Sequence, residues 1–506
     1  FKVILFQAIQ NAAWQVDLFM PPDAARLWVH GRIVNPNPWP IRAYWWTNIA
    51  APLTPGTRVL SPATHSIEHL PPDGRLSRVP FPHVGEDDGS YPARHTYATS
   101  TFYRQQAHAP WIAAVDEAGH GLAQCSTANQ VGRKLFVFGN HPGGKRWMDY
   151  LAEPGKGGYI EIQAGLMPTQ NQEFDLPAGG IVEWTECLTP FDLDPTEAHN
   201  PDYRLATCAA EARLTDMITQ EELARQDQWL TTQATKPPAI VLHRGSAWGM
   251  LHEKLTGGRI SPGLVFETNM STEQPWLELA TDGFFSAATL ARAPESYVIS
   301  ERWEKVLIQS VAVHGTTWLH ELALGTIALN RDNFETAADH FERSRTLRPN
   351  HLALRNLAII AIQRKQPGAA RDLYRQAWAC APTVVTLAVE ICQFLQQNES
   401  ARDLDQFVAD LPPAFASHER IRLAFGLRAL HMGDWGRLRE ILDQGYASIR
   451  EGEILLTDLW FTMHVRQEEQ RVGRSLTSGE VANLVRNTPP PARIDFRMND
   501  SFTILK

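Results

Sequence analysis

The feature that most constrains the fold of this 506-residue chain is a repeat in its last third. Small residues recur at fixed places, followed by an aromatic residue and a proline, and Pro349 and Pro382 lie 33 positions apart. Small residues let two helices approach closely, and the aromatic residue packs against the next unit. The pattern therefore predicts stacked helical hairpins. The positions are Leu324-Gly325, Ala328, Asn333-Phe334, Ala337 and Phe341 in the first unit, and Leu357-Ala358, Ala361, Ala370, Tyr374 and Ala377 in the second.

A third set of these positions, Gly426, Ala429 and Gly433-Asp434-Trp435, follows after a degenerate unit. The spacing resembles that of tetratricopeptide repeats (TPR), whose period is about 34 residues. We expect residues 316–486 to form this helical domain and residues 487–506 to form a C-terminal tail. The resemblance implies a protein or peptide partner on the concave face. The alternative is that the repeats only brace the rest of the chain.

The first 198 residues follow a different pattern. Short apolar runs alternate in period two and are separated by glycine- and proline-rich turns, which predicts antiparallel β-structure. From about residue 200 the spacing becomes helical, as in Tyr203–Leu230, and residues 239–315 mix short helices with turns. We therefore expect a β-sandwich over 1–198 and a helical connector over 199–315. A chain of this length should divide into several domains.

The most informative part of the first region is a series of three short pieces, Phe138–Trp147, Gly158–Gly165 and Leu176–Glu186. In the middle piece, strand alternation puts Glu161 and Gln163 on one face. With the polar residues upstream they could form a sugar site. On the alternation alone, a half-exposed strand with solvated side chains is the better explanation. The glycines of Phe138–Trp147 read as a turn after a strand, without a helix start. The upstream candidates are Asn140, His141, Arg146 and Trp147.

Tryptophan is abundant, with 16 residues in the chain. Sugar rings stack on indoles, but large aromatic side chains also fill β-sandwich cores. Trp45 and Trp46 are adjacent in an expected strand, so one should face the core and the other a cleft or solvent.

The strings around Glu161 resemble the closing strands of aldose 1-epimerases (galactose mutarotases). In that family a glutamate in an E-x-Q strand is the general base, which implies this role for Glu161, with Gln163 two residues on. The segment Leu27–Pro52 resembles the strand pair that carries the family's general-acid histidine. Aligning Asn48-Ile49 there places Tyr44 at the position of that histidine, so His141 is the candidate acid.

A closer resemblance is to a bacterial family of unassigned function, in which a mutarotase-like domain precedes tetratricopeptide repeats. It rests on Tyr44–Pro52, Phe136–Gly144, Tyr159–Gly165 and Glu183–Glu186. It implies a galactose-mutarotase-like β-supersandwich followed by a TPR solenoid. Because such a sandwich needs more strands than residues 1–190 supply, we expect the chain to begin inside a domain.

Composition argues against several classes of function. The net charge is −9 without a dense basic run, so nucleic acid is not an expected partner. No apolar stretch reaches about 18 residues, so we expect no membrane span. The five cysteines are widely spaced without a CxxC pair, which favours a reducing cytoplasm. The histidines show no zinc-type helical pair, and we expect no metal or cofactor.

Two classes of function follow. The first is a carbohydrate-active enzyme, an epimerase or glycosidase, that acts at the anomeric centre of a mono- or oligosaccharide, with Glu161 and His141 as catalytic residues. The second is a carbohydrate-binding module without catalysis, coupled to a TPR scaffold. The expected sugar-contacting residues are Trp45, Trp46, Asn48, Asn140, Arg146, Trp147 and Gln163.

Overall fold

The computed structural model describes residues 1–70, 75–84, 87–104, 110–153, 155–268, 272–398, 401–450 and 452–505. The chain divides into two compact units. Unit 1 comprises Phe1–His243, Arg259–Phe266 and Asp495–Ser501, and unit 2 comprises Arg244–Gly258, Glu267–Ile494 and Phe502–Lys506.

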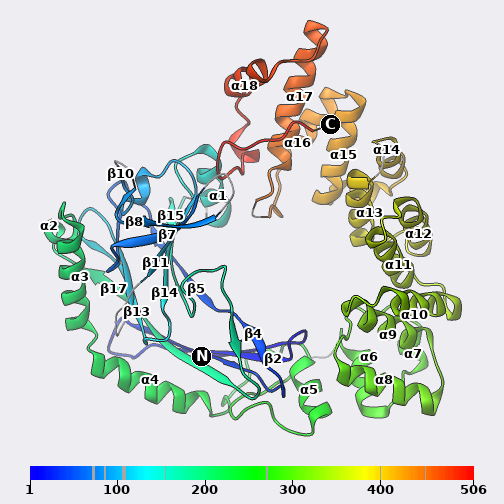
Figure 1. The fold of residues 1–506 in the computed structure, drawn as a ribbon, viewed down its shortest axis with the longest axis horizontal. Helices are drawn as coiled ribbons and strands as arrows, with labels where there is room; N and C mark the ends of the chain where they lie inside the picture. Colours follow the sequence, from blue (N-terminus) through cyan, green and yellow to red (C-terminus); the bar gives the residue numbers. More distant parts are fainter. Residues whose placement is uncertain are drawn as a thin grey trace. The chain divides into compact units, whose positions relative to one another are not determined.

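Unit 1 is built around two antiparallel sheets (Figure 1). The seven-stranded sheet has the order β1 (Lys2–Gln7), β2 (Ala12–Phe19), β3 (Leu27–Val34), β17 (Ile181–Asp192), β13 (His120–Ser126), β12 (Trp111–Val115) and β6 (Arg58–Leu60). The six-stranded sheet has the order β5 (Trp46–Pro52), β15 (Tyr159–Gly165), β14 (Gly132–Val137), β11 (Thr99–Arg104), β7 (His65–Leu70) and β8 (Arg75–Pro80). Two short pairs complete the unit: β4 (Ile41–Ala43) with β16 (Phe174–Leu176), and β9 (His83–Val84) with β10 (Asp87–Asp88).

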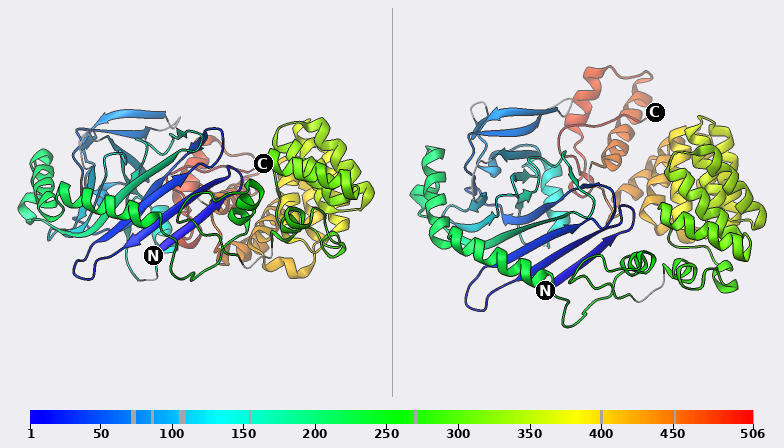
Figure 2. Two further views of the ribbon diagram at one scale, coloured as in Figure 1. Left: turned by 90° about the horizontal axis from the view of Figure 1, so that it is seen from below. Right: turned by 60° about the horizontal axis from the view of Figure 1, so that its bottom comes forward.

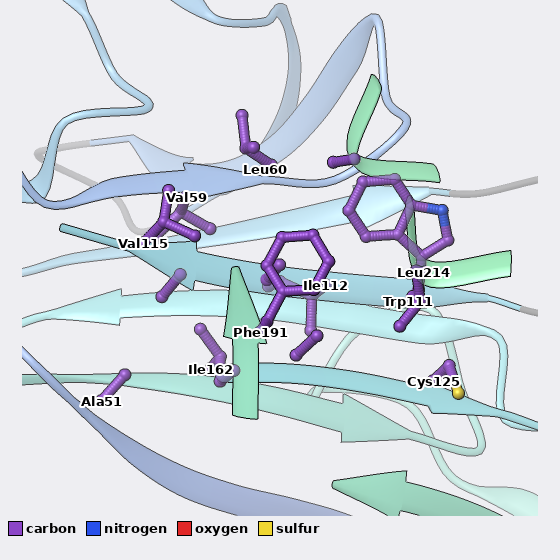
Figure 3. Close-up of a cluster of buried hydrophobic side chains, with 14 of the residues drawn as sticks. Ala51, Val59, Leu60, Trp111, Ile112, Val115, Cys125, Ile162, Phe191 and Leu214 are labelled. Atoms are coloured by element: carbon purple, nitrogen blue, oxygen red, sulfur yellow. The ribbon is translucent and has the colours of Figure 1, made fainter. Parts of the chain in front are cut away.

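The core of unit 1 follows from strand alternation. Ile160 and Ile162 of β15 are fully buried, and they share a hydrophobic cluster with Ile112 of β12 in the other sheet (Figure 3). The opposite face of the seven-stranded sheet is covered by helices α3 (Tyr203–Met217) and α4 (Gln220–Ala234). Figure 2 shows α4 running along β2 and β3. Strands such as β3 and β12 in this sheet are thus buried on both faces, whereas the edge strand β1 exposes Val3 and Leu5. The short helix α2 (Pro195–Ala198) leads into α3.

One local expectation was wrong. The sequence predicts a glycine turn within residues 138–147, but helix α1 spans Pro142–Leu151. His141 caps it by accepting a hydrogen bond from the Gly143 amide, and Pro142 supplies a first helical residue whose missing N–H costs nothing there. Burial of Trp147 and Met148 offsets the glycine cost of about 1 kcal/mol per residue. Histidine is an uncommon cap, which hid the helix start.

Unit 2 consists of helices. Four of them precede the repeats: α5 (Trp248–Thr256), α6 (Gln274–Asp282), α7 (Ala287–Leu290) and α8 (Glu301–His314). Successive hairpins are α9 (Trp318–Asn330) with α10 (Phe334–Leu347), α11 (His351–Gln363) with α12 (Pro367–Cys380), α13 (Val385–Asn398) with α14 (Ala401–Ala409), α15 (Glu419–Met432) with α16 (Trp435–Asp443), and α17 (Leu455–Val472) with α18 (Ser478–Asn487).

Small residues at the repeat positions let the two helices of one hairpin approach closely, as predicted. A Cβ added to Gly325 of α9 would lie 2.7 Å from the Phe341 ring of α10, so only glycine allows this approach. Gly433 ends α15 in the left-handed conformation, and the Asp434 carboxylate then caps α16. A β-sandwich followed by helical hairpins, the predicted fold class, is therefore confirmed.

Candidate functional site

The face of β15 that points away from the core carries Glu161 and Gln163. Alternation places them there because Ile160 and Ile162 fill the core, and β15 lies between β5 and β14. Gln163 is opposite Asn48 of β5 and Lys134 of β14, and Glu161 is opposite Ala50 and Phe136. The register thus gathers polar side chains from three neighbouring strands.

A chain of hydrogen bonds connects these side chains. Lys134 Nζ donates to Gln170 Oε1 at 2.6 Å, and Gln170 Nε2 donates to Gln163 Oε1 at 2.7 Å. Gln163 Nε2 in turn donates to Glu161 Oε2 at 2.8 Å. Each donor fixes the amide orientation of the next residue, so the chain holds the Glu161 carboxylate in one direction.

Aromatic side chains lie beside this chain. The Lys134 ammonium is 5.3 Å from the Phe102 ring centroid and 5.0 Å from that of Phe136. Such contacts stabilise a cation held away from water. The Trp46 indole packs on Gly165, where an added Cβ would come within 2.2 Å of the ring. Trp46 also meets Phe102 edge to face.

Trp45 points to the other side of the strand. Its ring packs against Trp184 at 5.1 Å, and its Nε1 donates to the Thr47 hydroxyl at 3.0 Å. Trp45 and Trp46 thus face opposite sides of the sheet, and both are half-buried. That one of them faces a cleft or solvent stays a prediction.

A pocket of about 470 Å³ opens next to Glu161. Its lining combines the carboxylate, an amide, an ammonium and a phenol with apolar side chains from β5 and the end of α1. Burial, followed by the charge of Glu161, raises the pKa of the Tyr159 phenol, so this group is a neutral donor at pH 7. The lining residues include Asn48, Pro52, Leu151, Ala152, Lys156, Tyr159 and Glu161.

The four candidates from Asn140 to Trp147 have other surroundings. The Asn140 amide donates to the Ala93 carbonyl. The His141 ring caps α1 through Nδ1, and its Nε2 lies 3.1 Å from an Asp500 carboxylate oxygen. Arg146 and Trp147 contact Phe496 of the C-terminal segment. Of the expected residues, the structure thus brings Asn48, Glu161, Gln163 and Trp46 to one face of the sheet. Tyr44, which precedes β5, is 41% exposed.

Sequence reasoning missed Lys134 and Gln170. Lys134 could have been found, because the alternation of Lys134, Phe136 and Leu135 already separates two faces of β14. Gln170 could not, since it lies in the loop after β15 and reaches Gln163 through the loop conformation alone.

A second buried carboxylate, Glu186, belongs to the core. It accepts hydrogen bonds from Thr47, Gln124, Gln130 and Trp184 and is fully buried. Burial lowers the pKa of nearby Arg133 to about 10, and the Glu186 charge opposes that shift. With every donor supplied by the protein, this cluster is a structural network. Glu183 faces the other way, as strand alternation predicts.

Two general properties concern the described residues. Among them, no helix has both the length and the apolar character needed to cross a membrane. They also contain no group of three or more His, Cys, Asp or Glu side chains placed to hold a metal ion.

Comparison with known families gives one sequence match, and it carries no function. Residues 5–185 match the family described as a domain of unknown function, DUF5107. A search of curated proteins finds no match.

Comparison with solved structures gives several neighbours. A TPR-domain containing protein from Parabacteroides distasonis is similar with a TM-score of 0.61 and 17% identity, over 98% of this chain and 74% of that one. A putative aldose 1-epimerase from Escherichia coli matches with a TM-score of 0.30 and 11% identity, over 38% of this chain and 64% of that one. A galactose mutarotase-like protein from Clostridium acetobutylicum matches with a TM-score of 0.26 and 9% identity, over 38% of this chain and 65% of that one. The structural neighbours therefore include mutarotase-like and TPR proteins. The TPR-domain containing protein from Parabacteroides distasonis shares the fold of nearly the whole chain.

Proposed function

We propose that the outer face of β15 binds a mono- or oligosaccharide, with Glu161 as the acceptor for sugar hydroxyl groups. The observation that carries this proposal is the hydrogen-bonded chain from Lys134 to Glu161 beside the pocket. A carboxylate held in one direction by a neutral amide keeps free lone pairs for hydroxyl donors. The Asn48 amide and the Tyr159 phenol add a donor and an acceptor on the same wall.

The geometry favours binding over catalysis. Among the described residues that line the pocket, Glu161 is the one carboxylate and there is no histidine. A glycosidase of the usual kind needs a second carboxylate on the other side of the scissile bond. The imidazole of His141 is engaged with Gly143 and Asp500. We therefore place binding first.

Ring-opening of an aldose is the second candidate, because Tyr159 and Glu161 lie in one pocket. Glu161 would take the proton of the anomeric hydroxyl, the bond from the anomeric carbon to the ring oxygen would break, and the phenol would protonate that oxygen. A phenol with a raised pKa holds its proton strongly, which makes it a slow general acid near pH 7.

The test is calorimetric titration of the full chain with D-glucose, D-galactose, maltose and lactose, alongside polarimetry of freshly dissolved aldoses. We expect saturable binding of at least one sugar. Glu161→Gln should weaken that binding about ten- to hundredfold, because it replaces a charged acceptor by a neutral amide. Glu197→Gln, a change of the same kind at an exposed site on α2, should have no effect. Equal binding by both variants, or no binding of any sugar, would contradict the proposal.

The helical hairpins suggest a second ligand, a protein or peptide partner. In these hairpins Arg355 of α11 pairs with Glu390 of α13 at 2.8 Å, and the Tyr374 hydroxyl donates to the same carboxylate. A partner carboxylate could replace Glu390 at Arg355. Selection from a random peptide library should then enrich acidic peptides that bind the wild-type chain and not Arg355→Ala. If no acidic peptide is enriched, the bracing role becomes the better explanation.

A further inference from the structure

The C-terminal segment Asp495–Ser501 belongs to unit 1, although the chain on both sides of it belongs to unit 2. The segment contains no helix or strand, yet Asp495 and Phe496 are almost completely buried. Burial of an irregular segment requires that other parts of unit 1 satisfy its backbone groups. The groups that do so lie on α1 and on the loop before β11.

Phe496 occupies an aromatic socket on α1. Its ring meets Trp147 at 5.1 Å and Tyr150 at 5.3 Å, both edge to face. The Arg146 guanidinium lies 4.9 Å from the ring centroid. The Trp147 indole N–H donates to the Phe496 carbonyl at 2.8 Å, so the same side chain recognises both ring and backbone.

The backbone of the segment lies directly against the start of α1. A Cβ added to Gly143 would come within 1.9 Å of the Arg497 carbonyl oxygen, so glycine is required for this contact. The Ala98 amide donates to the Met498 carbonyl at 3.1 Å. The Asp500 carboxylate accepts a hydrogen bond from the Tyr97 hydroxyl and faces His141 Nε2. These contacts fix the register of the segment on the helix.

The segment also holds its own conformation. Arg497 donates through Nε and Nη2 to the two oxygens of Asp495, each at 2.9 Å, and both side chains are buried. A paired charge is far less costly to bury than a single one. The pair therefore allows a charged segment to dock in an apolar setting.

Helix α1 connects this docking site with the pocket. The segment contacts residues between Gly143 and Tyr150, whereas Leu151 and Ala152, at the end of the same helix and its cap, form one wall of the pocket beside Glu161. A helix of ten residues transmits a shift of one end to the other.

We propose that Asp495–Ser501 is an intramolecular ligand of α1, and that its docking sets the position of the pocket wall. His141, Arg146 and Trp147 then serve as the receptor for this segment. The part of the inference that concerns sugar affinity rests on the proposed function, whereas the docking itself does not.

The experiment uses the full chain and hydrogen–deuterium exchange. Phe496→Ala should increase exchange of the α1 amides at least about tenfold, because the helix loses the ring against which Trp147 and Tyr150 pack. Phe502→Ala is the matched control, since Phe502 lies in the same tail but packs on Phe461 of unit 2. A synthetic peptide covering residues 493–503, added in excess, should restore protection in the Phe496→Ala chain. Unchanged exchange in α1 would overturn the inference.

Gly143→Ala provides a second variant that does not remove core volume. Alanine favours the helix itself but collides with the Arg497 carbonyl, so residues 495–501 should lose protection while α1 remains folded. Protection of that segment equal to wild type would overturn the docking geometry.

Sugar titration of the same variants separates the two proposals. Rapid α1 exchange in Phe496→Ala together with sugar affinity reduced at least about threefold supports both. The same exchange in a chain whose wild type binds no sugar supports docking and rejects the sugar site. Unchanged sugar affinity despite rapid α1 exchange would overturn the link between the segment and the pocket.

Discussion

The two sheets of unit 1 each carry a carboxylate on the outer face, and the surroundings of these two carboxylates differ. On the seven-stranded sheet Glu183 lies 3.2 Å from Arg32 and 3.9 Å from His30, and helix α4 runs along the same face. On the six-stranded sheet Glu161 accepts a hydrogen bond from the neutral Gln163 amide and borders a pocket. A covered carboxylate with a cationic partner is part of the fold. A carboxylate with a neutral partner beside a pocket is where we expect a ligand to bind.

Helices α3 and α4 cover one face of the seven-stranded sheet. We expect the largest effect of this cover on the rate at which cysteine thiols react. Cys125 and Cys187 face each other across β13 and β17 and are buried, whereas Cys208 and Cys380 are exposed. The Cys125 contact and burial raise the pKa of the Cys187 thiol, so little thiolate exists there at pH 8. We expect iodoacetamide to alkylate the exposed pair about a thousandfold faster, since the buried pair reacts only after opening.

Peptide mass mapping over time measures these rates, and labelling in urea, where all five cysteines should react, is the control. Comparable rates for Cys187 and Cys208 in the folded chain would show that α3 and α4 do not cover this face.

Neutralising the two carboxylates should separate their roles in stability. Glu183→Gln leaves the buried Arg32 without its closest counter-charge and should cost about 3 kcal/mol. Glu161→Gln keeps the amide contact possible and should cost less than about 1 kcal/mol. Differential scanning calorimetry, which can resolve separate transitions of two units, measures both. A larger loss for Glu161→Gln would reverse the comparison.

The same ion pair predicts a pH dependence. The His30 contact and the Arg32 charge lower the pKa of Glu183 below its ordinary value of about 4.3. A carboxyl group with a lowered pKa stabilises the folded state above its unfolded pKa, and this contribution is lost as the pH falls through the folded pKa. The stability difference between wild type and Glu183→Gln should therefore be constant near pH 6 and shrink below about pH 4. Melting at a series of pH values tests this, and a difference that persists at pH 2 would contradict it.

The sequence was informative where structure depends on local alternation and uninformative where it depends on distant contacts. Period two placed Glu161 and Gln163 opposite Ile160 and Ile162, and the repeat spacing predicted a close approach of two helices, which Gly325 allows. Both patterns reflect contacts between neighbouring elements, so they leave a periodic trace.

Helix α1 left no such trace. Gly143 is needed there because the Arg497 backbone, more than 350 positions away in the sequence, lies against it. The same holds for Trp147, whose hydrogen-bond partner is Phe496. The local sequence shows which polar residues this helix carries. It does not show that the C-terminal segment packs against these residues.

The smallest effect we predict concerns two asparagines that the sequence does not distinguish. Asn48 lines the pocket beside Glu161, whereas Asn140 donates to the Ala93 carbonyl before β11. Loss of one neutral hydrogen bond to a sugar should weaken binding about fivefold, so Asn48→Ala should raise the dissociation constant by that factor. Asn140→Ala removes a contact within the protein and should leave affinity within about twofold of wild type, with a lower melting temperature instead. Calorimetric titration of both variants gives the ratio. If Asn140→Ala weakens binding more than Asn48→Ala, the sugar contacts the loop before α1, and the outer face of β15 is not the binding surface.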